Sequence, residues 1–317
     1  MGDDARAETA IHVRDLHKSY WAREAVSGID LDIAVGEIFG FLGPNGAGKS
    51  TTIEILEGYR KRTAGEAWVL GTDPGKPTRA WRERIGLVLQ DSELEPTLTV
   101  RETVTLFSDF YPRPRPVDET IELVGLKEKR DARIGTLSGG QRRRADVAVA
   151  IVGDPDLVFL DEPTTGFDPT ARRDAWNMIE GLKSLGKTIF LTTHYMDEAQ
   201  HLADRVAILA HGRIVARGRP DELGGATNQA TAIRFKMPEG VTVDQLRGAA
   251  QAAVEVSGSE ATVQSEDPQD TLYRLLSWAD REGRKLEALE VQRPSLEDVF
   301  LQLTRSADAP APQEATA

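Results

Sequence analysis

The chain contains 317 residues, of which 39 are basic and 51 acidic, so its net charge is −12. Because neither the part before Asn228 nor the part after it is basic, the chain lacks the electrostatic footprint of a protein that wraps nucleic acid. Cysteine is absent, which excludes disulfides and thiol chemistry, and no apolar run approaches the roughly 20 residues that a membrane-spanning helix needs.

The first stretch, residues 1–10, lacks the basic and apolar pattern of a signal peptide, and we expect it to be disordered. Length and composition favour a soluble, cytoplasmic protein with one large domain and one smaller domain. Strand-like apolar patterns then follow at residues 11–13, 29–33 and 37–42.

Residues 43–51 form a glycine-rich sequence of the type G-x-x-x-x-G-K-[ST], which runs from the strand at 37–42 into an expected helix at 52–56. Glycine lets successive backbone N–H groups converge on phosphate oxygens at the start of a helix, where the peptide dipoles favour negative charge. Lys49 would supply a cation for the β- and γ-phosphates, and Ser50 a hydroxyl for Mg²⁺. The residues expected to bind a nucleoside triphosphate are Asn45, Gly46, Ala47, Gly48, Lys49, Ser50 and Thr51.

Three further apolar stretches have the character of buried parallel strands, at residues 85–89, 157–160 and 188–193. Each is followed by polar residues that can act chemically, namely Gln90, Asp161 with Glu162, and His194. In an open α/β sheet, ligands lie outside the carboxyl ends of the strands. We therefore expect these side chains to face the glycine-rich loop.

The chemistry of these residue types predicts hydrolysis of a nucleoside triphosphate. Asp161 is interpreted as the carboxylate that holds Mg²⁺ through its water shell, which leaves Glu162 free to orient the attacking water and take its proton. Gln90 could contact Mg²⁺ or that water, and His194 could donate to the γ-phosphate. The expected catalytic residues are thus Glu162, His194 and Gln90, and the expected metal site is Ser50, Gln90 and Asp161.

The remaining patterns divide the chain. Residues 92–153 have the spacing of an inserted helical subdomain, and residues 206–209 with 213–216 suggest a hairpin that closes the first domain. A linker is expected at 219–229, and a tail rich in Ala, Pro and Glu at 306–317 is expected to be disordered. Between them lies a small α/β block over 230–305, with expected strands and helices at 231–237, 243–252, 268–282, 288–292 and 296–303.

Taken together, these motifs resemble the ATP-binding subunit of an ABC transporter. The resemblance covers about residues 11–218, and the sequence Leu-Ser-Gly-Gly-Gln at 137–141 is nearly diagnostic of that family. The other residues that carry it are 43–51, Gln90, 160–163, Phe167, Asp168 and His194. It implies an α/β fold: a P-loop NTPase domain with a mixed central sheet, an antiparallel β subdomain and an inserted helical subdomain, followed by a small α/β C-terminal domain.

The resemblance also implies a head-to-tail homodimer that sandwiches two ATP molecules. One subunit would then complete the partner's site through Ser138, Gly139, Gly140 and Gln141, and Asp168 would link the two sites across the interface. Tyr20 matches the aromatic residue that stacks on adenine in this family, and the adjacent Trp21 is a rival for that role.

Within the family, residues 139–144, 192–199 and 294–300 resemble daunorubicin-resistance-type exporters. In that branch the ATPase is a separate chain that uses ATP and Mg²⁺, partners an integral-membrane permease and lies at the cytoplasmic face of the membrane. The resemblance implies export of a drug, antibiotic or lipid-like compound. The alternatives are the ATPase of an importer and a soluble ABC ATPase that acts as a regulatory module; Glu162 and His194 argue against a module with little turnover.

Overall fold

The computed structural model describes residues 9–21, 23–89, 93–226, 231–292 and Phe300. The chain divides into two compact units, Met1–Arg219 and Pro220–Ala317, which are treated separately below. Over these described ranges, every helix falls short of the combined length and apolar character that crossing a lipid bilayer requires.

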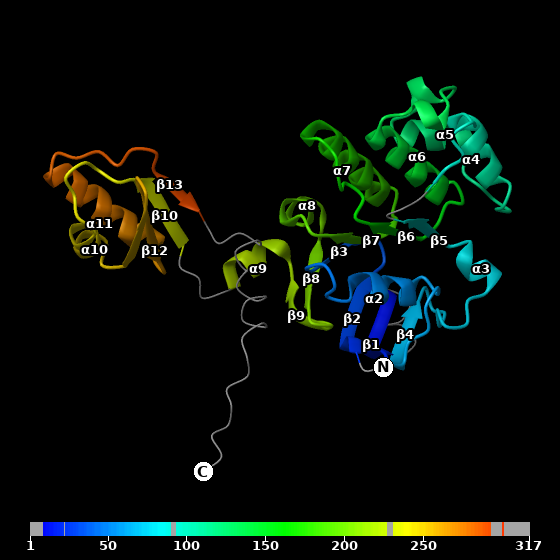
Figure 1. Ribbon diagram of the computed structural model, residues 1–317, viewed down its shortest axis with the longest axis horizontal. Coiled ribbons are helices and arrows are strands. Elements are labelled where there is room, and N and C mark those ends of the chain that lie inside the picture. Colours follow the sequence, from blue (N-terminus) through cyan, green and yellow to red (C-terminus); the bar gives the residue numbers. More distant parts are fainter. Residues whose placement is uncertain (1–8, 22, 90–92, 227–230, 293–299, 301–317) are drawn as a thin grey trace, which may run out of the picture. The chain divides into compact units, whose positions relative to one another are not determined.

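A six-stranded sheet with the order β5-β6-β7-β3-β8-β9 forms the centre of the first unit (Figure 1). Its strands are β3 (Ile38–Leu42), β5 (Ile85–Val88), β6 (Leu157–Asp161), β7 (Thr188–Thr193), β8 (Arg205–Ala210) and β9 (Arg213–Gly218). All neighbours pair in parallel except β8 and β9, which form the expected antiparallel hairpin. The register pairs Leu42 with Thr193 and Asp161 with Thr192, so the carboxyl ends of β3, β6 and β7 lie at one edge.

Aromatic packing fixes these three strands against one another. The ring of Phe190 on β7 lies 6.0 Å from that of Phe39, and 5.5 Å from those of Phe41 and Phe159, between centroids. All four side chains are buried. Because densely packed interiors resist deformation, this cluster holds the strand ends, and the polar residues that follow them, in a defined arrangement.

A second, antiparallel sheet with the order β2-β1-β4 belongs to the same unit. It contains β1 (Thr9–Tyr20), β2 (Arg23–Ala34) and β4 (Ala64–Val69). The first two strands extend well beyond the apolar segments expected at 11–13 and 29–33, because their paired polar residues continue the ladder to the pair of Tyr20 and Arg23. Trp21 lies in the turn between them with a φ of 52°.

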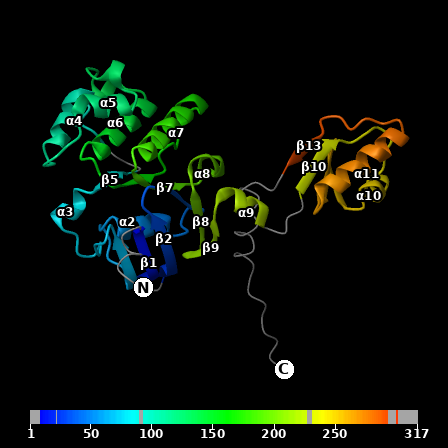
Figure 2. The ribbon, with the colours of Figure 1, turned by 180° about the vertical axis from the view of Figure 1, so that it is seen from behind.

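The inserted region is helical, as predicted. It contains α4 (Val100–Ser108), α5 (Val117–Leu123), α6 (Gly139–Ile151) and the 3-10 turns η1 (Lys127–Lys129) and η2 (Ile134–Thr136). In Figures 1 and 2, α4, α5 and α6 group together at the end of the unit opposite to β1, β2 and β4. The other helices of the unit are α2 (Lys49–Leu56), α3 (Arg79–Arg82), α7 (Pro169–Ser184) and α8 (Met196–Leu202).

The second unit is a small α/β domain with an antiparallel sheet of order β11-β12-β10-β13. Its elements are α9 (Pro220–Ala226), β10 (Thr231–Lys236), α10 (Val243–Ala250), β11 (Ala253–Ser257), β12 (Glu260–Ser265), α11 (Pro268–Arg281) and β13 (Glu290–Gln292). Ile233, Phe235, Leu246 and Leu275 are fully buried members of its apolar core.

Three differences from the sequence-based expectations concern this unit. The stretch expected to be a linker contains α9, which begins at Pro220 and carries Asp221 and Glu222 in its first turn, where the helix dipole favours acidic residues. The hairpin of β11 and β12 was not expected. The last strand begins at Glu290 rather than 288, after Ala288 with a φ of 51°. Apart from Phe300, the helix expected at 296–303 lies outside the described residues, as do both expected disordered ends up to residue 8 and from 306.

Candidate functional site

The glycine-rich loop connects β3 to the start of α2 and bends sharply at two glycines. Gly46 has a φ of 80° and Gly48 a φ of 108°, conformations that L side chains rarely adopt. A Cβ atom on Gly48 would lie 2.4 Å from the carbonyl oxygen of Ala25, so only glycine fits there. No side chain caps the N-terminus of α2, which begins at Lys49. The first N–H groups of this helix are therefore available to an anionic ligand.

A cavity of about 610 Å³ lies over this loop. That volume is in the range of small-molecule sites. The residues that line it are Tyr20, Arg23, Ala25, Asn45, Gly46, Gly48, Lys49, Ser50, Thr51 and Glu162. Ala47, also expected at the site, is not among them, since its side chain is buried in the apolar core.

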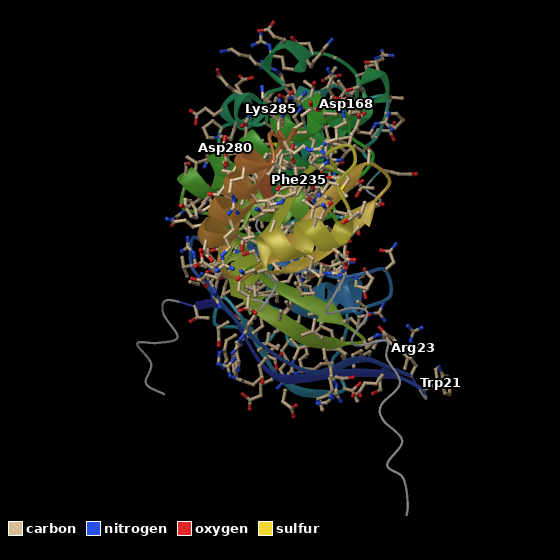
Figure 3. The ribbon with its side chains drawn as sticks, turned by 90° about the vertical axis from the view of Figure 1, so that its left-hand side faces the viewer. Trp21, Arg23, Asp168, Phe235, Asp280 and Lys285 are labelled. Carbon is tan, nitrogen blue, oxygen red and sulfur yellow. The ribbon has the colours of Figure 1, made fainter. Side chains whose placement is uncertain are left out.

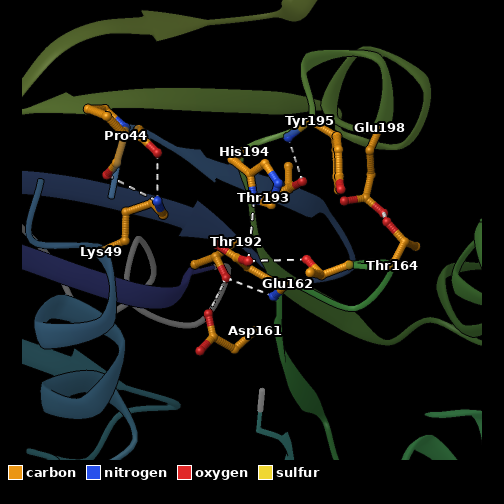
Figure 4. A network of polar contacts seen from close by, with 12 residues as sticks. Pro44, Lys49, Asp161, Glu162, Thr164, Thr192, Thr193, His194, Tyr195 and Glu198 are labelled. Carbon is orange, nitrogen blue, oxygen red and sulfur yellow. Dashed lines mark hydrogen bonds and ion pairs between the residues drawn. The ribbon is translucent and has the colours of Figure 1, made fainter. Parts of the chain in front are cut away.

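Lys49 brings a buried positive charge to the cavity. Its Nζ donates to the carbonyl oxygens of Gly43 at 2.6 Å and Pro44 at 3.2 Å (Figure 4). Burial lowers the pKa of the Lys49 ammonium, while Glu162 and Asp161 oppose that shift. A desolvated cation held by neutral acceptors gains strongly from a phosphate oxygen, so this side chain is suited to an anionic ligand.

At the end of β6, Asp161 and Glu162 are held by the neighbouring strand. The Thr192 hydroxyl donates to Asp161 Oδ1 at 2.5 Å, and the backbone N–H of Glu162 donates to the carbonyl and hydroxyl oxygens of Thr192, both at 3.1 Å (Figure 4). Glu162 has a φ of 46°, which is uncommon for a residue with a side chain. Strained positions of this kind cluster at functional sites.

His194, which follows β7, lies beside Glu162 as the strand-end argument predicts. Its Nδ1 is 3.3 Å from Glu162 Oε2, and the Thr165 hydroxyl donates to the same oxygen at 3.1 Å. The Glu162 side chain is 11% exposed and lines the Lys49 cavity, whereas that of His194 is 39% exposed and does not line it. Gln90, the third expected catalytic residue, lies outside the described residues.

The Leu-Ser-Gly-Gly-Gln segment lines a different cavity, of about 480 Å³. Ser138, Gly139 and Gly140 contribute to it, together with Asp168 and Glu162. Gln141 does not line it, because its side chain accepts from the backbone N–H of Ser138 at 3.1 Å in a capping box at the start of α6. The described residues from this segment therefore do not join the Lys49 cavity within one chain.

Asp168 caps α7. Its Oδ1 accepts hydrogen bonds from the backbone N–H groups of Thr170 and Ala171, each at 2.9 Å. The carboxylate thus fixes the start of α7 while its residue also lines the cavity of Ser138. Asp168 and Ala171, at the start of α7, would therefore face any molecule that enters that cavity.

The two aromatic candidates at the β1–β2 turn differ in their surroundings. Tyr20 lines the Lys49 cavity, and its ring lies 4.9 Å from Lys18 Nζ and 5.2 Å from Arg60 Cζ. Trp21 is fully exposed and does not line the cavity. Figure 3 shows Trp21 and Arg23 projecting from the same end of the hairpin.

The sequence did not predict that two arginines, Arg23 and Arg143, contribute to the site. Arg23 lines the Lys49 cavity because it pairs with Tyr20 across the β1–β2 turn. Arg143 on α6 donates to the carbonyl oxygens of Leu89 and of Asp161, the latter at 2.6 Å. The hairpin pattern was a usable signal for Arg23, whereas no sequence signal pointed to backbone acceptors for Arg143.

Comparisons with known proteins agree with this geometry. A family model for ABC transporters matches residues 26–165, and a model of an ABC transporter domain-containing protein-like C-terminal domain matches residues 231–295. The chain is 38% identical over 307 residues to Nod factor export ATP-binding protein I of Rhizobium etli, with 95% of each chain covered. It is 40% identical over 305 residues to the protein of the same name from a Rhizobium species, with 94% of this chain and 98% of the relative covered.

Solved structures show the same fold in the first unit. The structure of cbiO1 from Clostridium perfringens, part of the ABC transporter complex cbiONQ, is 30% identical with a TM-score of 0.62, and 68% of this chain and 90% of that chain are covered. The ATP-binding cassette MJ0796, in a dimeric post-hydrolysis state bound to ADP and Pi, is 25% identical with a TM-score of 0.59, and 66% of this chain and 98% of that chain are covered. The chain belongs to the ABC transporter family, in which it is an ATP-binding subunit whose ATPase activity is coupled to transport.

Proposed function

We propose that this subunit drives an exporter by acting on a separate integral-membrane permease, and that the cargo is a drug, an antibiotic or a lipid-like compound. The named relatives are export ATP-binding proteins for Nod factor, which supports the direction of transport. The sequences at 139–144, 192–199 and 294–300 favour the daunorubicin-resistance-type branch. In this proposal the subunit lies at the cytoplasmic face of the membrane, bound through the permease.

Within the Lys49 cavity, we assign the triphosphate to the loop of Asn45 to Thr51 and the adenine to Tyr20. Ser50 lines this cavity, whereas Asp161 does not line it but acts electrostatically on Lys49; both would supply oxygen ligands of the kind that Mg²⁺ prefers, and Gln90 is the third proposed ligand. The described residues hold no cluster of three His, Asp or Glu side chains that could bind a metal alone. A site with few protein ligands fits Mg²⁺ that is shared with substrate phosphates, where it neutralises charge that develops during phosphoryl transfer.

Hydrolysis in this scheme depends on Glu162, His194 and Gln90. Glu162 orients water and accepts its proton, and the contact of 3.3 Å with His194 Nδ1 keeps its carboxylate at the cavity edge. His194 is assigned to the γ-phosphate, and Lys49 leaves its backbone acceptors to pair with phosphate oxygens. The chemistry requires no covalent intermediate.

One observation carries the proposal of a homodimer with shared sites: Glu162 lines both the cavity of Lys49 and the cavity of Ser138. A second copy that presents Ser138, Gly139, Gly140, Gln141 and Asp168 to the nucleotide would enclose Glu162 from both sides. Exclusion of water around the phosphates strengthens the electrostatic interactions that lower the barrier. The two cavities are therefore assigned to one composite site for each nucleotide.

Two measurements test this function. Glu162→Gln keeps the size of the side chain but removes the proton acceptor, so ATP binding should persist while turnover falls by about 100-fold or more. Wild-type turnover in that variant would eliminate Glu162 as the base. For transport, the tagged full chain should copurify with a permease from native membranes, and ATP should drive cargo outward in vesicles that contain both. Inward movement would indicate an importer, and the absence of any permease would favour a soluble regulatory ATPase.

A further inference from the structure

Behind the proposed catalytic pair lies a fully buried carboxylate that the mechanism above does not use. Glu198 on α8 is 0% exposed, and so is Thr164, whose hydroxyl donates to Glu198 Oε1 at 2.8 Å. The indole Nε1 of Trp176 on α7 donates to the same oxygen at 3.2 Å. Figure 4 shows Glu198 and Thr164 on the side of Glu162 and His194 that faces away from Lys49.

These hydrogen bonds join three segments that lead to the catalytic pair. Thr164 comes two residues after Glu162, Glu198 comes four residues after His194, and Trp176 belongs to the helix that Asp168 caps. Glu162 and His194 also contact each other directly. Glu162 and His194 are therefore connected in two ways: directly, and through the Thr164–Glu198 hydrogen bond and the short backbone segments on either side of it.

A second set of contacts holds the same two helices together beside this hydrogen bond. Arg172 on α7 pairs with Asp197 at 3.0 Å, and its guanidinium lies 4.4 Å from the centre of the Tyr195 ring. Tyr195 in turn packs against His194, with 4.1 Å between ring centroids. Arg172 thus links α7 to α8 through Asp197, and to the His194 ring through Tyr195.

Burial of a carboxylate is costly unless hydrogen bonds compensate, and an apolar side chain would fill the same space at lower cost. Burial raises the pKa of Glu198, against the opposing effect of hydrogen bonds from Thr193, Thr164 and Trp176. Unlike an apolar residue, Glu198 offers a directional acceptor to Thr164, in the segment that follows Glu162 with its φ of 46°. Such fixed geometry matters for a proton acceptor, which must stay within hydrogen-bond reach of water.

We propose that Glu198 is a positioning residue for ATP hydrolysis. Its hydrogen bonds with Thr164 and Trp176 connect the segment after Glu162, and α7, to α8, and thereby keep Glu162 and His194 in their relative positions. It contacts neither nucleotide nor metal in this scheme. Its effect should therefore fall on turnover and leave nucleotide binding intact.

The test compares full-length Glu198→Ala, Glu198→Gln and Thr164→Val in ATPase assays, with affinity measured by a fluorescent ATP analogue. Glu198→Ala should lower kcat by about 10- to 100-fold, in line with a misplaced general base, while KM and nucleotide affinity stay within about twofold. Glu198→Gln should recover most of kcat, because its amide oxygen still accepts from Thr164 and Trp176. Thr164→Val should reproduce much of the loss, and adding it to Glu198→Ala should lower kcat little further, since Glu198→Ala already breaks the Thr164 contact as well as that with Trp176.

Glu180→Ala is the matched control, because Glu180 is a half-exposed residue on α7 that faces α8 through His201 at 3.7 Å. Its kcat should equal that of the wild type. If Glu198→Ala does not fold, Thr164→Val and Trp176→Phe carry the test, since each removes a single donor. Wild-type kcat in folded Glu198→Ala, or a loss that follows weakened nucleotide binding, would overturn the proposal. A loss in Glu198→Gln as large as that in Glu198→Ala would overturn it as well.

Discussion

Glu57, the C-cap residue that follows α2, is a carboxyl group that the fold buries to 8% exposure. Burial raises its pKa to about 7, and the negative charges of Asp161 and Glu54 add to that shift. Because the folded chain binds this proton more tightly than the unfolded chain does, the stabilising contribution is fully present below about pH 4.5 and is lost as the pH rises through 7. The lost stability is on the order of 3 kcal/mol.

Glu57→Gln should therefore remove a pH-dependent part of the stability. The wild type should melt at a lower temperature at pH 8 than at pH 6, whereas the variant should show a smaller difference and exceed the wild type at pH 8. Glu66→Gln, on β4, is the control and should leave the pH dependence unchanged. Parallel melting curves for wild type and Glu57→Gln at all pH values would show that Glu57 is not protonated in the folded chain.

At the scale of elements, α6 is tied to the ends of two strands by one side chain. Arg143 donates to the carbonyl oxygens of Leu89, after β5, and of Asp161, at the end of β6. A rigid tether of this kind couples the position of the inserted helices to the proposed metal ligand. Arg143→Met should lower kcat by about tenfold while ATP affinity stays unchanged, because Arg143 does not line the Lys49 cavity.

The adjacent Arg144 offers a matched control for that experiment. Its NH1 is 3.9 Å from Asp174 Oδ2 on α7, a long contact that contributes little to stability. Arg144→Met should therefore retain wild-type kcat. Equal losses in the two variants would mean that the basic run acts through its total charge rather than through the two carbonyl contacts of Arg143.

Sequence patterns were sufficient to predict those elements whose residues match a single structural type. Buried parallel strands and the glycine-rich loop were predictable, and the strand-end rule brought Glu162 beside His194. Elements with mixed signals were missed. In β11 and β12, apolar and polar residues alternate, but Glu255 and Glu260 make these short segments too polar to stand out as strands. In α9, the two glycines suggested a linker. Hydrogen bonds to backbone acceptors, such as those of Arg143, depend on the tertiary structure and have no periodic pattern in the sequence.

At the scale of the whole molecule, the division near Arg219 separates nucleotide chemistry from the C-terminal unit. The six-stranded sheet ends with β9 at Gly218, and every residue that lines the Lys49 cavity precedes that point. A chain that ends at Arg219 should therefore fold and bind a fluorescent ATP analogue with wild-type affinity. A folded truncation that has lost nucleotide binding would show that the second unit contributes to the site.

The proposed dimer predicts complementation between two inactive subunits. Lys49→Ala removes the cation from a subunit's own cavity, and Ser138→Arg places a large charged side chain in the segment assigned to the partner's nucleotide. Each homodimer should be nearly inactive, since both of its composite sites carry a lesion. In a mixed dimer, both lesions fall in the same composite site, and the other site is intact. ATPase activity should therefore return on mixing.

The control for mixing is the pair Lys49→Ala with Glu162→Gln. Both residues belong to the cavity of a single subunit, so a mixed dimer carries one lesion in each composite site and should remain inactive. Differently tagged subunits verify that mixed dimers form, because only these are retained by both affinity resins. Activity in the Ser138→Arg mixture alone would require sites shared between subunits. If verified mixed dimers of that pair stay inactive, each cavity must act within its own chain, and the cavity of Ser138 needs another occupant.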